Sequence, residues 1–358
     1  MLEFMTTIQV KKLTEPGLEI DPEVFNKLMA SDGAPSDLFG HSVAVSGDGQ
    51  TVVVGAWGDG DKGNSSGSVY IFTKQANGSY AQTQKLVPSD GRANDGFGFS
   101  VAVSGDGQTV VVGTPFDDDQ GDASGTVYIF TKQANGSYLR IQKLVAADGA
   151  IEFVFGSSVV ITADGSTIVV GATQNGSKAT DAGSAYIFTK QSNGTYLQTQ
   201  KLVAADRASR DKFGESVAIT PDGSTVVVGA FQDDDKGSDS GSAYVFTKQS
   251  NGTYLQTQKL VASDGAPNDY FGYRVYVSGD NSTIIVGAYI DDDDDKGTNS
   301  GSVCIFTKQA DGSYLQSQKL LASDGAANDY FGCSVAISNT SVVVGAQGHL
   351  TKGAVYVY

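Results

Sequence analysis

The residues of this 358-residue chain that are best suited to chemistry are aspartates gathered in short, glycine-containing stretches. Hard cations such as calcium take six to eight oxygen ligands, which clustered carboxylates and nearby backbone carbonyls supply. Like charges this close repel one another, and a bound cation relieves that repulsion. A solvated acidic face that keeps the protein soluble is the alternative. We predict calcium ligands among Asp59, Asp61, Asp117, Asp118, Asp119, Asp233, Asp234, Asp235, Asp291, Asp292, Asp293, Asp294 and Asp295.

Aromatic residues form a second group of candidates, because they stand at recurring positions where other copies of the same pattern carry different residues. Exposed aromatic rings stack on sugar rings or grip a peptide side chain. The alternative is that these side chains only pack between neighbouring structural units. We predict a protein or glycan ligand at Trp57, Phe231, Tyr289, His41 and Tyr273.

Known catalytic patterns are absent from the sequence: it contains no G-x-S-x-G, no H-E-x-x-H and no phosphate-binding glycine loop. We therefore predict a non-catalytic protein. Carboxylate pairs abound, so a glycosidase or lyase on the same scaffold is one alternative, although nothing singles out one pair. A purely structural domain of a larger surface protein is the other.

These candidates recur because the chain is an array of repeats. A Phe-Gly pair occurs at residues 39, 97, 155, 213, 271 and 331, which gives four steps of 58 residues and one of 60. A fixed period of this size indicates one supersecondary unit that has been copied. We expect a single domain over residues 22–358 rather than two domains.

Each copy contains four short segments typical of β-strands, which in the second copy cover residues 100–104, 109–113, 125–132 and 137–145. Tight turns such as Gly105-Asp106-Gly107 and Asn135-Gly136 join the first segment to the second and the third to the fourth, and they favour two-residue hairpins. Longer polar loops join the second segment to the third, and the fourth segment to the first segment of the next copy, so both kinds of long loop lie at the same end of the repeat. The sequence predicts an all-β, six-bladed β-propeller with four antiparallel strands per blade. A parallel β-helix, the alternative, has much shorter coils than this repeat.

The two ends of the chain are complementary. The sixth copy stops at Tyr358 after its third strand, whereas residues 24–33 match residues 256–265, which include a fourth strand. We expect residues 22–30 to complete the last blade, because closure removes open sheet edges. Residues 1–21 match no repeat and form a leader or extension of unknown role.

The composition limits the partners. The net charge of -16 disfavours nucleic acid, which needs a surface rich in lysine and arginine. No apolar run approaches the roughly 18 residues that span a bilayer, so we expect no direct membrane insertion. We expect a monomeric ring, alone or within a longer chain.

The repeat residues carry a family resemblance. Phe-Gly opens each copy, and Gly-Ala follows the second strand at Gly55, Gly171, Gly229, Gly287 and Gly345. The sequence resembles FG-GAP repeat proteins, which include the N-terminal propeller of integrin α subunits. The resemblance implies an extracellular or cell-surface module for recognition and adhesion. Integrin-type repeats place calcium between the first and second strands, where this chain has a tight turn with few carboxylates, so we do not transfer that site.

Glycosylation sequons are frequent, as expected of an extracellular glycoprotein. Four of them coincide with the Asn-Gly turns, where the hairpin is a sufficient explanation for the asparagine. The sequon asparagines are Asn64, Asn77, Asn135, Asn175, Asn193, Asn251, Asn281 and Asn339.

Overall fold

The structure is a computed structural model that describes residues 27–149, 151–174, 182–292, 296–337 and 341–358. Its strands form six sheets, which we call blades 1 to 6. Blade 1 contains β1 (Ser42–Val45), β2 (Thr51–Ala56), β3 (Ser68–Lys74) and β4 (Tyr80–Leu86), and blade 2 contains β5 (Ser100–Val103), β6 (Thr109–Thr114), β7 (Thr126–Lys132) and β8 (Tyr138–Leu144). Blade 3 contains β9 (Phe155–Ile161), β10 (Thr167–Ala172), β11 (Ser184–Lys190) and β12 (Tyr196–Leu202), and blade 4 contains β13 (Phe213–Ile219), β14 (Thr225–Ala230), β15 (Ser242–Lys248) and β16 (Tyr254–Leu260). Blade 5 contains β17 (Phe271–Val277), β18 (Thr283–Ala288), β19 (Ser302–Lys308) and β20 (Tyr314–Leu320), and blade 6 contains β21 (Phe331–Ile337), β22 (Val342–Ala346) and β23 (Ala354–Val357).

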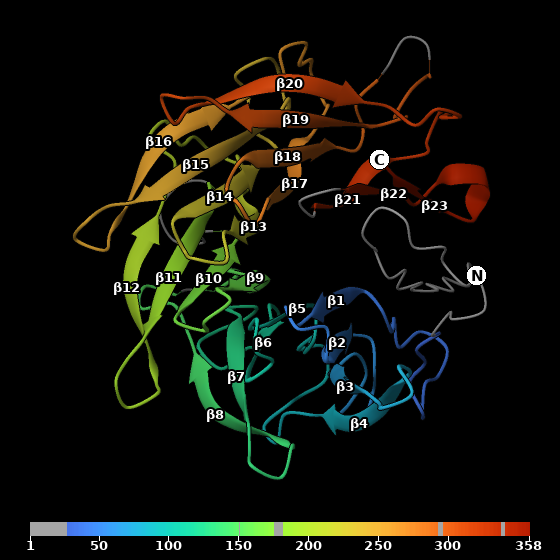
Figure 1. The fold of residues 1–358 in the computed structure, drawn as a ribbon, viewed down its shortest axis with the longest axis vertical. Helices are drawn as coiled ribbons and strands as arrows, with labels where there is room; N and C mark the ends of the chain where they lie inside the picture. Colours follow the sequence, from blue (N-terminus) through green and yellow to red (C-terminus); the bar gives the residue numbers. More distant parts are fainter. Residues whose placement is uncertain (1–26, 150, 175–181, 293–295, 338–340) are drawn as a thin grey trace.

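The blades stand around a common centre, with β1, β5, β9, β13, β17 and β21 innermost and β4, β8, β12, β16 and β20 at the rim (Figure 1). Neighbouring strands in each blade are antiparallel and follow sequence order. The predicted six-bladed β-propeller is therefore confirmed. The one described helix is a 3-10 turn at His349–Thr351, and no helix in the described ranges is long and apolar enough to cross a membrane.

Burial explains the sequence of each strand. The second strand of a blade, such as TVVVGA in β14, is buried along its whole length because blades cover both of its faces. Such strands read as continuous apolar runs. The outer strand of the same blade, YLQTQKL in β16, is exposed at its second and fourth residues and buried or half-buried at the others, which suits a strand at a sheet edge.

The hairpins differ from the predicted two-residue turns. Between β5 and β6, the N–H of Ser104 donates to the carbonyl of Thr109, which leaves four residues in the turn. Asp106 stabilises this longer turn by accepting hydrogen bonds from the hydroxyl of Ser104 and the N–H of Gln108. Between β7 and β8 the turn has three residues, and Gly136 adopts a φ of 85° that closes it.

The hydrophobic core lies between blades rather than within one of them. Each of five described clusters draws its buried side chains from two successive blades. Five of the six phenylalanines of the Phe-Gly pairs belong to this core, whereas Phe39 is half-buried against the core of blade 1. Phe213, for example, is buried with its ring centroid 5.4 Å from that of Tyr244. A single repeat cannot bury these surfaces alone, so the blades depend on their neighbours.

Glutamines also connect the outer strands of successive blades. The side-chain amide of Gln142 in β8 donates to the carbonyl of Tyr196 in β12 at 2.8 Å and accepts from its N–H at 2.7 Å. The same pair of bonds joins Gln84 to Tyr138, Gln200 to Tyr254 and Gln258 to Tyr314. These contacts hold the rims of neighbouring blades in register.

The junction between blades 6 and 1 differs from the others. Val355 and Val357 of β23 are 69% and 59% exposed, whereas the equivalent Val127 and Ile129 of β7 are fully buried. Among described residues, β21 and β1 also lack the packing that joins the other successive inner strands. The predicted closing strand, residues 22–30, falls partly outside the described residues, and Leu28 packs on the core of blade 1. Closure by the N-terminal segment stays a prediction.

Two truncations test this closure. Deleting residues 1–21 is expected to leave the melting temperature unchanged, because this segment matches no repeat. Deleting residues 1–28 is expected to lower the melting temperature and to promote aggregation, because β23 then presents an open apolar edge. Thermal melts with light scattering measure both effects. Equal melting temperatures for the two truncations would rule out a closing strand at residues 22–28.

Candidate functional site

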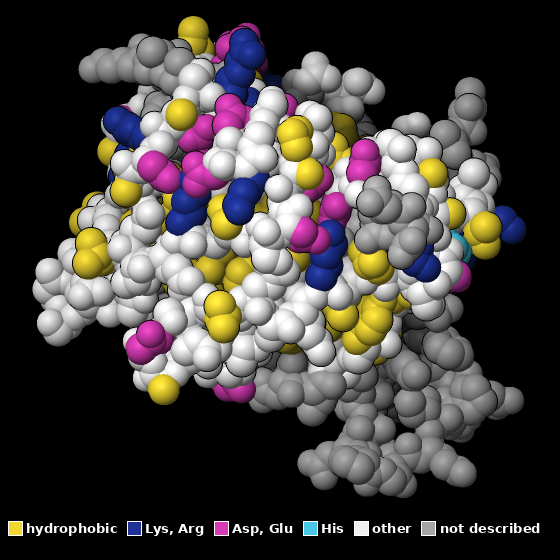
Figure 2. Space-filling view, turned by 90° about the horizontal axis from the view of Figure 1, so that it is seen from above, with side chains coloured by type: hydrophobic (Ala, Val, Ile, Leu, Met, Phe, Trp, Pro, Cys, Tyr) yellow, Lys and Arg dark blue, Asp and Glu magenta, His cyan; other side chains and the backbone are white. Residues whose placement is uncertain are grey.

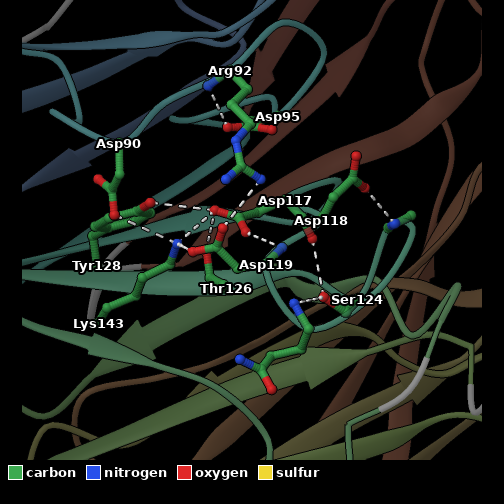
Figure 3. Close-up of polar contacts among 12 residues, drawn as sticks. Asp90, Arg92, Asp95, Asp117, Asp118, Asp119, Ser124, Thr126, Tyr128 and Lys143 are labelled. Atoms are coloured by element: carbon green, nitrogen blue, oxygen red, sulfur yellow. Dashed lines mark hydrogen bonds and ion pairs between the residues drawn. The ribbon is translucent and has the colours of Figure 1, made fainter.

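The acidic loop of blade 2 folds around a lysine (Figure 3). Asp117, in the loop that follows β6, is 2% exposed, and its Oδ2 lies 2.9 Å from the Nζ of Lys143 in β8. Lys143 also contacts Asp119 of the same loop and lies 3.7 Å from Asp90, which follows the preceding blade. The hydroxyl of Tyr128 donates to Asp117 at 3.2 Å. We call this arrangement a lysine-centred cluster.

Three other blades repeat the lysine-centred cluster. In blade 4 the Nζ of Lys259 lies 2.7 Å from Asp206, 3.0 Å from Asp233 and 2.5 Å from Asp235. In each case the lysine comes from the outer strand, the buried aspartate from the acidic loop and another aspartate from the loop before the blade. The equivalent sets are Lys85 with Asp32, Asp59 and Asp61, and Lys319 with Asp264 and Asp291.

The charges in these clusters stabilise one another. Burial on its own lowers the pKa of Lys259, but hydrogen bonds with Asp206, Asp235 and Asp233 hold that pKa above its ordinary value. Burial raises the pKa of Asp206, and hydrogen bonds from Lys259 and Tyr244 outweigh this effect and lower it. Burial, together with the charge of Asp233, raises the pKa of the Tyr244 hydroxyl. The lysine and Asp206 are therefore charged, and the tyrosine is neutral, at physiological pH.

The donor set does not fit a metal ion while the lysine is in place. Carboxylate oxygens of Asp206, Asp233 and Asp235 lie within 4.8 Å of one another, a spacing that a cation can bridge. The ammonium of Lys259 already contacts all three, so calcium would have to displace it. Calcium binding by the acidic loops stays a prediction from the sequence, and Asp293, Asp294 and Asp295 lie outside the described residues.

Other predicted calcium ligands close their own loops. An Oδ1 atom of Asp118 accepts from the N–H of Ala123, and that of Asp234 accepts from the N–H of Asp239, both at 2.8 Å. Asp292 accepts in the same way from Asn299 at 2.7 Å. These carboxylates have a structural role that their loops explain.

The turns between the first and second strands also do not provide a calcium cage. Asp48 accepts hydrogen bonds from the hydroxyl of Ser46 and the N–H of Gln50, and it is the only carboxylate of its turn. Asp106, Asp164, Asp222 and Asp280 occupy the same position in blades 2 to 5. One carboxylate per turn is too few for an ion that takes six to eight oxygen ligands.

Two of the predicted ligand-binding residues lie in one aromatic cluster near the centre of the propeller. The ring of His41 lies 5.8 Å from that of Trp57 and 4.9 Å from that of Phe99, and Phe99 lies 5.6 Å from Phe116. These residues come from blades 1 and 2, so the rings also pack between blades. The Nε1 atom of Trp57 is buried and has no hydrogen-bond acceptor in the described part of the chain. We call these four residues the first aromatic cluster.

The other three predicted residues lie in a second aromatic cluster, formed by blades 4 to 6. The ring of Tyr273 lies 4.2 Å from that of Tyr289 and 5.6 Å from that of Phe231. Tyr270 and Tyr330 extend the cluster, at 5.1 Å from Phe231 and 6.1 Å from Tyr289. All five rings are half-buried, so they pack between blades and keep part of their surface exposed.

A cavity of about 240 Å³ lies beside the first aromatic cluster, and Arg274, which follows Tyr273 of the second cluster, also lines it. His41 and Phe99 of the first cluster line it, together with serines from four blades. Its charged side chains are Glu215 and Arg274, which form an ion pair at 3.5 Å, and Arg274 stacks at 4.2 Å on the ring of Tyr273. Burial, and the nearby charge of Arg274, lower the pKa of His41, which favours the neutral imidazole. The serines are Ser42, Ser100, Ser157, Ser158 and Ser216.

Sequence reasoning missed the lysines and part of the aromatic clusters. Lys85, Lys143, Lys201, Lys259 and Lys319 occupy the same place in the QKL motif of five copies, which was the available signal. The sequence also marked Arg274 as unusual, because the other five copies have serine at that position. On the face drawn in Figure 2, acidic side chains lie beside lysine and arginine rather than forming a patch of one sign.

Comparisons with known proteins agree with the fold. Integrin alpha-6 from Gallus gallus is 32% identical over 184 residues, which are 49% of this chain and only 16% of that relative. A gluconolactonase from Pseudomonas aeruginosa has a TM-score of 0.58 at 17% identity, covering 86% of this chain and 78% of its own. Hydrazine synthase from Kuenenia stuttgartiensis has a TM-score of 0.58 at 16% identity, covering 90% and 78%. These two structures show the fold alone.

A family model described as FG-GAP repeat matches residues 23–72, 80–130, 138–188, 196–246, 254–306 and 314–358. These six matches cover most of the chain and agree with the six copies of the Phe-Gly pattern. The chain therefore belongs to the FG-GAP repeat family.

Proposed function

We propose that this protein is a non-catalytic, extracellular recognition and adhesion module that binds a glycan at its central cavity. The observation that carries the proposal is where the copies differ. Their second strands are nearly identical, but the residue after each Phe-Gly pair is different in all six copies: His41, Phe99, Ser157, Glu215, Tyr273 and Cys333. A scaffold that needed only to fold would tolerate the same residue in every blade. Four of these residues, His41, Phe99, Ser157 and Glu215, line the cavity, and their different side chains favour an asymmetric ligand.

The chemistry of the cavity favours a sugar. Aromatic faces pack against the C–H faces of sugar rings, while serine hydroxyls and the Glu215–Arg274 pair supply donors and acceptors for sugar hydroxyls. Glu215 is the only carboxylate among the residues that line the cavity. Most glycosidases need a pair of carboxylates, so this lining supports binding rather than hydrolysis. The match to integrin alpha-6 supports a place at the cell surface.

The test is a glycan-array screen followed by calorimetry on the best ligand. His41→Ala and Phe99→Ala, which remove rings that line the cavity, are each expected to weaken binding about tenfold, which corresponds to about 1.4 kcal/mol. Leu255→Ala serves as the control, because Leu255 is exposed on the outer strand β16, and it is expected to bind as the wild type does.

Three results would count against this proposal. Unchanged binding by folded His41→Ala and Phe99→Ala variants would place the ligand elsewhere. A protein ligand competing at the same residues would replace the glycan. Release of reducing ends or unsaturated products from polysaccharides would favour the carbohydrate-active enzyme instead.

A further inference from the structure

The acidic loop of blade 4 is built around one buried carboxylate. Asp233 is 4% exposed, and it accepts hydrogen bonds from the hydroxyls of Ser242 and Tyr244 and from the N–H of Asp235. These contacts set the path of the chain between β14 and β15. A buried carboxylate without a counter-charge is strongly destabilising, so the loop needs a cation at this place.

Lys259 supplies that cation from within the chain. Its ammonium contacts Asp206, Asp233 and Asp235 together, and its Nζ lies 5.2 Å from the centroid of the Tyr244 ring. The lysine side chain is only 17% exposed, so water screens these contacts weakly. An ammonium with three donors matches three carboxylates that converge on one point.

The same contact between a lysine and a buried loop aspartate recurs in blades whose loop sequences differ. Lys85, Lys143 and Lys319 occupy the equivalent position in blades 1, 2 and 5, and each contacts the buried aspartate of its own loop. Blade 3 provides a contrast, because Lys201 has one described carboxylate partner, Asp148, at 2.6 Å. The lysine is therefore common to five blades, and in the four blades that have a buried loop aspartate it serves as the counter-charge of that aspartate.

We propose that these lysines take the place of divalent metal ions, so that the acidic loops and the face that they build keep their structure without calcium. The inference replaces the calcium prediction made from the sequence. It does not depend on the proposed glycan site, because it concerns only the loops between the second and third strands.

Thermal melts of the wild-type protein test this inference directly. After EDTA treatment, the melting temperature is expected to be the same with and without added calcium chloride, because a ligand raises the melting temperature only if it binds the folded state. A calcium-selective rise over magnesium would overturn the proposal. Glycan binding, if present, should also be unaffected by EDTA.

A variant gives the complementary result. Lys259→Met removes the ammonium and leaves Asp206, Asp233 and Asp235 without it, so calcium is expected to raise the melting temperature of this variant but not that of the wild type. Lys201→Met is the matched control and is expected to show no calcium effect. A folded Lys259→Met variant that is insensitive to calcium would show that the lysine does not occupy a cation position. If Lys259→Met does not fold, the wild-type melts still decide the question.

Discussion

Replacing Lys143 with methionine is expected to lower the free energy of unfolding by about 3–5 kcal/mol, because it leaves the buried carboxylate of Asp117 without its partner. Methionine keeps much of the apolar stem, so the loss comes mainly from the charge. The variant also loses the contact of the ammonium with the Tyr128 ring, at 4.9 Å from its centroid. Urea unfolding followed by the fluorescence of Trp57, the only tryptophan, measures the change.

Two further variants separate the buried charge from a general effect of losing a lysine. Lys62→Met, at an exposed position of the blade 1 loop, is expected to change stability by less than about 0.5 kcal/mol. The double variant Lys143→Met/Asp117→Asn is expected to recover most of the loss, because the buried carboxylate that Lys143 neutralised is removed as well. A Lys143→Met variant as stable as Lys62→Met would mean that solvent already screens the attraction between Lys143 and Asp117.

The Lys143–Asp117 pair makes the stability of the wild type depend on pH in the alkaline range. Burial would lower the pKa of Lys143, but hydrogen bonds with Asp119, Tyr128 and Asp117 raise it above the ordinary value of 10.5. A base with a raised pKa in the folded state contributes stability that is complete below its unfolded pKa and is lost as the pH rises through its folded pKa. The stability of the wild type should therefore fall more steeply above pH 10.5 than that of Lys143→Met.

Gly229→Ala is expected to cost about 3 kcal/mol or more, because the blades approach each other closely at this residue. An added Cβ would lie 1.9 Å from the carbonyl oxygen of Gly272 in the next blade. Overpacking costs about 1–3 kcal/mol where side chains can shift, but here two backbones must separate. The cost is steric rather than conformational, since the φ of Gly229 is not in the left-handed region.

Gly60→Ala is the matched control for this prediction. Its added Cβ would have no atom closer than the carbonyl oxygen of Gly63, at 3.8 Å. We expect a change of less than about 0.5 kcal/mol, measured by the same urea unfolding. If Gly229→Ala were as stable as Gly60→Ala, the result would show that blades 4 and 5 do not approach each other so closely at Gly229.

Local patterns in the sequence predicted the strands closely. Residues 109–113 and 137–145 correspond to β6 (Thr109–Thr114) and β8 (Tyr138–Leu144), because an apolar run bounded by turn residues leaves few other structures. The turn between β5 and β6 was predicted less well. Its length depends on side-chain hydrogen bonds to Asp106, which the residue types alone do not specify.

The sequence also identified the aromatic positions but not their grouping. His41 and Trp57 are 16 residues apart and Phe99 is in the next copy, so their contact depends on how blades 1 and 2 pack. The lysine-centred clusters depend on packing in the same way. The loop sequences reveal clustered negative charge, whereas Lys143 is 26 residues from Asp117 and reaches it only from the outer strand β8.

By itself, the sequence determined the number of blades and the order of their strands, because each repeat is a unit that buries its faces only against its neighbours. It also determined which loops are acidic and which positions vary between copies. Only the tertiary structure decided which lysines contact those loops and which varied positions share a cavity. Both depend on distances between residues in different strands and blades, and packing sets those distances.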